Sequence, residues 1–331
     1  MDPTDCSLTL RQRFSQSAAH PGISVGIACG FISAVFYTLS NIALRQSVSV
    51  DSFFVAAMKS GPTIVFLTPY LLAMKWTGRR VAVSPHLIPR FMLVSLIGQV
   101  GGNGSFQFAL GKIGLAATVP ITLGSLLIAS AVLGRWILGE SVQRRTAIAI
   151  TILIAAVFLL SQSGETPLTG IAGDALRWEQ FSGAMFAVGS GVSFAIFSTT
   201  MRLSMQQGLQ SATAMWISGM VGTTALLAIA FSRIGLESLD GLTVGLWQSM
   251  IFAGVFNFVA FVAITTAMRV LPIVAVHLLN ASQVAMAATA GVILFSEPTT
   301  WKLISGIVLT MAGLMVLATR RPLKTSKEPI R

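Results

Sequence analysis

Apolar segments about twenty residues long recur along the whole chain, separated by short polar connections. A helix needs about 20 apolar residues to cross a hydrocarbon core about 30 Å thick. The pattern therefore predicts an all-α integral membrane protein with ten transmembrane helices. We place them at residues 23–43, 53–74, 91–110, 113–134, 146–162, 181–201, 212–232, 244–266, 271–295 and 302–319.

The longest polar connection separates the ten segments into two groups of five. We expect a first five-helix unit over residues 23–162, an extracytoplasmic connection over 163–180 and a second five-helix unit over 181–319. Residues 1–22 are expected to form a polar cytoplasmic tail, and residues 320–331 a basic one. The first apolar segment is too long for the core of a signal peptide, so we expect it to be retained.

Composition and charge support a membrane protein. Of the 331 residues, 54% are hydrophobic and 10% are charged, whereas a soluble domain carries about 25% charged residues. Of the 22 Lys and Arg residues, sixteen fall in the tails and connections on one side of the predicted bundle, five on the other and one inside a span. Basic residues concentrate on the cytoplasmic side. We therefore expect an inner-membrane protein with both termini in the cytoplasm, and the net charge of +11 gives no reason to invoke nucleic acid.

A single offset of 157 residues relates the two five-helix units. It pairs Arg45 with Arg202 and Glu140 with Glu297, and it also aligns glycines, serines and alanines from Gly26 to Leu160 with their counterparts. Five is an odd number, so the second unit is inverted relative to the first. Inverted repeats are typical of secondary transporters, whose site lies near the membrane midplane where the repeats meet.

Each unit has a fourth helix that ends in a glutamate, within Leu-Gly-Glu140 in the first and Ser-Glu297-Pro in the second. With Lys59 as a basic residue early in the second helix, this arrangement resembles the drug/metabolite transporter superfamily, and most closely its EamA-type ten-helix permeases. The resemblance covers nearly all of residues 23–319. It implies a transporter of small organic solutes with a central cavity between the halves and peripheral fifth and tenth helices, and it leaves the solute open.

Lys59 is the only charge well inside a predicted span. A charge at that depth costs about 3 kcal/mol on insertion scales and is a functional-site hypothesis by default. In a cavity it would suit a carboxylate or phosphate on the substrate. The alternative is that its long side chain reaches the outer interface of the membrane.

Polar stripes mark two predicted helices. Gln99, Asn103 and Gln107 recur every four residues, which gives the third helix one polar stripe. Asn280 and Gln283 are three residues apart and share a face of the ninth helix. These stripes favour the wall of a substrate site. Hydrogen bonding between helices is the alternative.

Other polar side chains stand alone within the spans. We favour helix–helix hydrogen bonding for Asn41 and Asn257. Tyr37, Trp216 and His277 are further candidates to stack on, or hydrogen-bond to, a substrate. For His277, simple packing is the alternative.

Glu140 and Glu297 each end a helix, where a carboxylate opposes the helix dipole. We therefore expect a structural role, in which each glutamate caps the start of the next helix or pairs across a loop. Arg144 and Arg145 are near Glu140 in sequence, and Lys302 is near Glu297.

The predicted spans contain no Asp or Glu, and the chain has neither a phosphate-binding loop nor a His/Cys pattern with metal-ligand spacing. We expect no enzyme activity, no cofactor and no metal. The interpretation is a secondary transporter, a carrier or exporter, for a small organic metabolite, with amino-acid-like compounds as candidates. Cationic drug efflux and a non-transporting membrane scaffold or sensor are the alternatives. The expected partners are the solute and membrane lipid, and association with further copies of the chain stays open.

Overall fold

A computed structural model describes residues 22–77, 87–138, 144–161, 171–235 and 241–318. All regular structure in these ranges is helical, which confirms the expected all-α class. The first part of the chain forms α2 (Ile23–Gln46), α3 (Ser52–Trp76), α4 (Leu87–Leu96), the π-helix η2 (Ile97–Gly104), α5 (Ser105–Leu138) and α6 (Arg144–Ser161). The second part forms α7 (Ile171–Gln206), α8 (Ser211–Ile234), α9 (Val244–Met268), α10 (Ile273–Asn280), α11 (Gln283–Phe295) and α12 (Trp301–Ala318).

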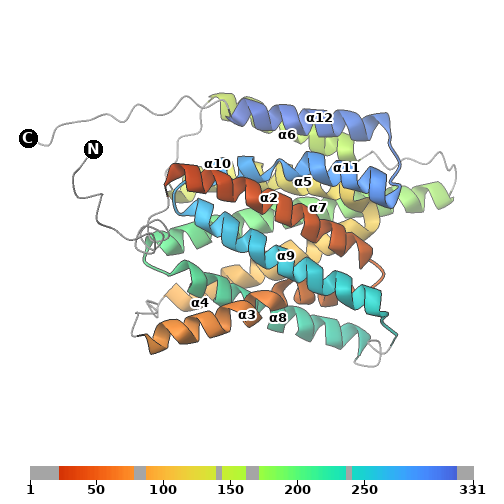
Figure 1. Cartoon of the computed structure of the whole chain (residues 1–331). Helices are drawn as coiled ribbons and strands as arrows, with labels where there is room; N and C mark the ends of the chain where they lie inside the picture. The colour runs from red at the N-terminus through yellow and green to blue at the C-terminus, as the bar shows by residue number, and fades with distance from the viewer. Residues whose placement is uncertain (1–21, 78–86, 139–143, 162–170, 236–240, 319–331) are drawn as a thin grey trace, which may run out of the picture.

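The helices run side by side along one direction (Figure 1). Helices α6 and α12 pack against each other at one margin of the bundle, where Gly306 and Gly313 of α12 face Leu160 and Leu153 of α6. Helices α5 and α7 pack together in the interior. The fifth helix of the first part and the last helix of the chain are therefore peripheral, as the resemblance implies.

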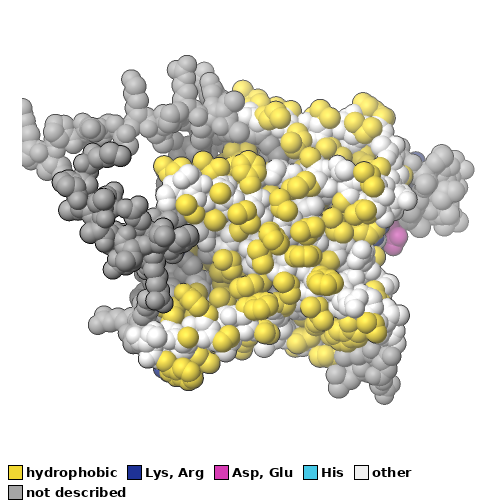
Figure 2. Space-filling model, viewed as in Figure 1, with side chains coloured by type: hydrophobic (Ala, Val, Ile, Leu, Met, Phe, Trp, Pro, Cys, Tyr) yellow, Lys and Arg dark blue, Asp and Glu magenta, His cyan; other side chains and the backbone are white. Residues whose placement is uncertain are grey.

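The outer surface of the helices is apolar. Large side chains such as Phe31, Phe66 and Val308 are half exposed or more, or nearly so. Figure 2 shows hydrophobic side chains and uncharged atoms across the described face, with charged colours only towards the ends of the helices. Seven helical segments of the described residues are long and apolar enough to cross a membrane, and Thr151–Leu160 and Trp301–Gly313 are shorter apolar helices. The molecule is a multi-pass membrane protein.

One of these segments, Leu87–Ile137, has 51 residues. A straight helix of that length would measure about 77 Å, more than twice the hydrocarbon thickness. The segment is not straight, because Gly114 has non-helical angles (φ 74°, ψ 179°) and two helices meet there at a kink. Left-handed φ values are accessible mainly to glycine. The break lies one residue from the predicted start of the fourth span.

The π-helix η2 is the second irregularity. Its glycines let the helix approach α7 closely, since an added Cβ at Gly98 would lie 2.8 Å from Phe197, and one at Gly102 would lie 2.6 Å from Phe194. Single π turns inside α-helices are frequent at functional sites. Here the π turn carries Gln99 and Asn103, two of the predicted site residues.

Candidate functional site

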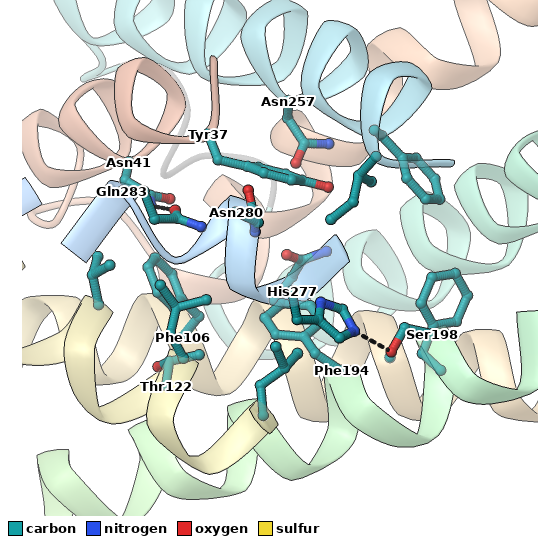
Figure 3. A pocket seen from close by; sticks show the side chains of 18 of the residues that line it. Tyr37, Asn41, Phe106, Thr122, Phe194, Ser198, Asn257, His277, Asn280 and Gln283 are labelled. Carbon is teal, nitrogen blue, oxygen red and sulfur yellow. Dashed lines mark hydrogen bonds between the residues drawn. The ribbon is translucent and has the colours of Figure 1, made fainter. Parts of the chain in front are cut away.

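A cavity of about 130 Å³ lies inside the bundle, between helices of both parts of the chain. Figure 3 shows it from close by, with Tyr37 and Asn257 on one side and Phe106 and Thr122 on the other. Seven predicted site residues line it: Tyr37, Lys59, Gln99, Asn103, His277, Asn280 and Gln283. They come from α2, α3, η2, α10 and α11, so residues distant in sequence meet at one place.

Lys59 ends inside the bundle and not at its surface. The residue is 6% exposed, and its Nζ donates a hydrogen bond to Asn103 Oδ1 at 2.9 Å. The ammonium also lies 5.4 Å from the centre of the Phe106 ring, within cation–π range. The expected alternative, in which the side chain reaches the membrane interface, is wrong for this structure.

Asn103 and Gln99 continue the network from Lys59. Asn103 Nδ2 donates to Gln99 Oε1 at 2.7 Å, and Ser60 Oγ donates to the same oxygen at 2.8 Å. Gln99 Nε2 donates to Ser218 Oγ of α8 at 2.9 Å. The chain of hydrogen bonds fixes the orientation of both amides, so that Asn103 presents its oxygen to Lys59.

Asn280 and Gln283 flank the break between α10 and α11, where the backbone at Ala281 and Ser282 leaves the helix. Ser33 Oγ donates to Asn280 Oδ1 at 3.1 Å, and Asn41 Nδ2 donates to Gln283 Oε1 at 3.3 Å. Figure 3 shows Asn41 and Gln283 next to each other on the wall of the cavity. Helix–helix hydrogen bonding and cavity lining are therefore combined in these amides.

His277 lies one turn before Asn280 and is 2% exposed. Its Nε2 is 3.2 Å from Ser198 Oγ of α7, the contact drawn as a dashed line in Figure 3. Its Nδ1 is buried and has no hydrogen-bond partner in the structure. A buried polar atom without a partner is costly, so this nitrogen is a position where a bound solute would gain a hydrogen bond.

Two predicted site residues lie elsewhere, and a third is outside the described residues. Gln107 does not line the cavity, and its Nε2 donates to the carbonyl of Leu44 at 3.3 Å. Trp216 does not line it either, because its indole N–H donates to Thr68 Oγ1 at 2.9 Å. Glu140 lies in a segment outside the described residues.

Several lining residues were not selected from the sequence. Asn41 and Asn257 were interpreted as links between helices, yet both line the cavity. Ser198 is 157 residues after Asn41, so the repeat offset would have identified it. The aromatic residues Phe106 and Phe194 carry no signal in an apolar helix that distinguishes them from lipid-facing ones.

Glu297 stabilises one end of the bundle. Its carboxylate accepts hydrogen bonds from the backbone N–H groups of Leu115 (2.6 Å) and Ala116 (2.8 Å), and it pairs with Arg45 Nε at 2.9 Å. It therefore caps the helix that begins after Gly114. The expectation of a helix cap is met, but on a helix of the first half and not on the next helix, and its ion-pair partner is Arg45 and not Lys302.

The two ends of the bundle differ. We call the end that carries Glu297 the Glu297 face. The opposite end, which we call the Arg269 face, carries the C-terminal ends of α3, α7 and α9. A vestibule of about 760 Å³ opens there, lined by Tyr70, Arg202, Gln210, Arg269 and their neighbours. Met268 lines both the vestibule and the cavity, so the two spaces adjoin.

Comparison with known proteins follows the same lines. Residues 181–319 match the model of the EamA-like transporter family. This half of the chain is an EamA-like transporter unit. The expected membership of the drug/metabolite transporter superfamily is thereby confirmed.

A solved structure, described only as "Crystal structure of protein", supports the same fold. It is 19% identical in sequence, and the match covers 91% of this chain and 98% of that one, with a TM-score of 0.60. No curated protein matches the chain. The fold and the family are thus assigned, and the solute has to be argued from the cavity.

Proposed function

We propose that this EamA-type protein is a secondary transporter that moves a small organic metabolite by alternating access between two inverted five-helix halves. The observation that carries the proposal is the position of the polar cavity. It lies between the halves and adjoins a vestibule at one face of the bundle, while inter-half ion pairs join the opposite face. Amino-acid-like compounds are the first candidates to test.

The repeat offset supports the inverted arrangement within the cavity itself. Four pairs of lining residues are separated by 157 positions: Tyr37 with Phe194, Asn41 with Ser198, Leu123 with Asn280, and Leu126 with Gln283. Equivalent positions of two repeats line one space when the repeats meet there. Ten crossings also fit the helices, if the 51-residue segment is counted twice because of Gly114 and the two shorter apolar helices are added to the seven.

Three ion pairs lie at the Glu297 face, and each joins a residue before position 139 to one after position 170. They are Arg45–Glu297 at 2.9 Å, Lys112–Glu179 at 3.3 Å and Arg233–Asp51 at 3.4 Å. Alternating access requires these contacts to separate while the vestibule closes. In the predicted orientation, with both termini cytoplasmic, the vestibule faces the cytoplasm and the ion pairs face outward.

A reversible cross-link at the Glu297 face tests the proposal. Ser249 Oγ donates to Gln46 Oε1 at 2.9 Å across the two halves. In a background with Cys6 and Cys29 replaced by Ser, a short bis-thiosulfonate is reacted with the Q46C/S249C variant. The solute is a radiolabelled compound selected by thermal shift from amino acids, organic acids, nucleosides, sugars and cationic drugs.

The cross-linked protein in liposomes is expected to bind the solute but not to exchange it, and a reductant should restore exchange. The single variants Q46C and S249C, treated with the same reagent, control for modification alone. Exchange at the uncross-linked rate would contradict alternating access. Selection of cationic drugs alone would favour the efflux alternative.

A further inference from the structure

The charge of Lys59 has no carboxylate partner among the described residues. An ammonium group has three N–H donors, and Asn103 Oδ1 accepts one of them. No Asp or Glu is among the described residues that line the cavity. Buried charges in proteins are normally paired. The cavity therefore has a net positive character that an anion would balance.

The remaining walls are mostly apolar. Phe106, Phe194, Phe197 and Phe261 line the cavity, together with the aliphatic side chains Val119, Leu123, Leu126, Ile264, Met201 and Met268. Ligand sites combine such walls with a few placed polar groups. A solute that fits would have one polar end towards Lys59 and an apolar body, either aromatic or branched.

The polar groups opposite the apolar walls provide hydrogen bonds but no negative charge. They are amides, hydroxyls and His277, whose Nδ1 has no partner. An α-amino acid would bring an ammonium group as well as a carboxylate. That ammonium would lie in the same cavity as Lys59 with no counter-charge among the described lining residues, which is unfavourable for like charges.

The vestibule has the same sign as the cavity. Arg202 and Arg269 line it, and Arg202 Nη1 donates to the carbonyl of Leu271 at 2.6 Å. Clefts that carry one sign of charge concentrate ligands of the opposite sign. The approach to the cavity therefore also favours an anion.

We infer that the substrate class is an organic monocarboxylate with an apolar body and without an α-ammonium group, held by Lys59 at its carboxylate. The inference rests on the proposed function and narrows it, because it ranks such anions above the zwitterionic amino acids.

A matched series of four compounds tests the inference. 3-Phenylpropionate, phenylalanine, 3-phenylpropanol and 3-phenylpropylamine share one apolar body and differ in charge. Binding to the purified full chain in detergent is measured by calorimetry. Because hydrogen bonds to charged groups are the stronger ones, 3-phenylpropionate is expected to bind about 10- to 100-fold more tightly than the other three.

Substitution of the lysine should remove this preference. K59M is expected to bind 3-phenylpropionate and 3-phenylpropanol about equally, and K59Q serves as a second neutral variant if K59M does not fold. K75M is the matched control, because Lys75 is an exposed lysine on the same helix that lines neither the cavity nor the vestibule. It should retain the wild-type order.

Tighter binding of phenylalanine or 3-phenylpropylamine than of 3-phenylpropionate would overturn the inference, as would an unchanged anion preference in both neutral variants. Binding of none of the four compounds would overturn it as well. Exchange of labelled phenylalanine in liposomes keeps the two proposals separate. If phenylalanine is exchanged and 3-phenylpropionate is not bound, the transport function stands and the substrate class is wrong.

Discussion

Replacement of Glu297 by Gln should destabilise the protein more than any comparable change at the surface. The side chain is 8% exposed and receives two backbone N–H groups and the guanidinium of Arg45. Glutamine keeps the shape, and its single oxygen can accept one of the N–H groups. Its amide nitrogen would then face the other N–H, so that donor meets donor.

The magnitude follows from these contacts. A buried N–H that loses its acceptor costs about 1–3 kcal/mol, and the lost charge at a helix N-terminus adds about 0.3–2 kcal/mol. The ion pair adds about 0–1 kcal/mol, because Arg45 is 21% exposed and screened. The expected total is about 2–4 kcal/mol. At a few degrees for each kcal/mol, the melting temperature should fall by about 5–15 °C.

The assay is thermal melting followed by fluorescence-detected size exclusion in one detergent. E179Q is the matched control, because Glu179 pairs with Lys112 at 3.3 Å but is 61% exposed. Its expected effect is below about 1 kcal/mol. If E297Q melts within about 2 °C of the wild type, or no lower than E179Q, the assignment of Glu297 as a helix cap between the halves is refuted.

Two glycine substitutions have internal controls in the same helices. At Gly114, an added Cβ would need a left-handed φ of 74° and would lie 2.5 Å from Glu297 Oε1, so G114A should cost at least about 2 kcal/mol in thermal melting. G111A should cost nothing, because no atom lies within 4 Å of its Cβ position. At Gly191 of α7, the Cβ would meet the backbone of α5 at Thr122, so G191A should cost about 1–3 kcal/mol. G189A has nothing within 4 Å and should melt like the wild type.

The helices could be predicted from the sequence because their lengths are set by the thickness of the membrane. Even the break at Gly114 lies within a residue of the predicted boundary. Lys59 could be predicted as a site residue for a related reason. A charge inside an apolar helix is costly unless it lies in the protein interior, and the structure places its Nζ at Asn103.

The stripe on the third helix was predicted only in part. Four residues advance an α-helix by about 400°, so a period of four drifts by about 40° at each step. Gln99 and Asn103 lie together in the π turn, but Gln107 follows three residues after its end and bonds to Leu44. The sequence does not specify a π turn, so it could not indicate which of the three amides would line the cavity.

The partner of Glu297 could not be found from local sequence. Lys302 is five positions away, whereas Arg45 is 252 positions away. Which of them pairs with the carboxylate depends on how the two halves pack, and local sequence does not specify this packing. The position of Trp216 depends on packing for the same reason, since its N–H finds Thr68 on a neighbouring helix.

The most direct test of the account is the accessibility of a cysteine at Thr122, a buried residue that lines the cavity between the halves (Figure 3). The variant T122C, with Cys6 and Cys29 replaced by Ser, is treated with a membrane-impermeant thiosulfonate from either side of sealed vesicles. S130C is the control, because Ser130 is buried in the same helix but does not line the cavity. Alternating access predicts that T122C reacts from both sides, that a bound solute protects it from both, and that S130C reacts from neither. Reaction of T122C from one side only, with and without solute, would contradict the account.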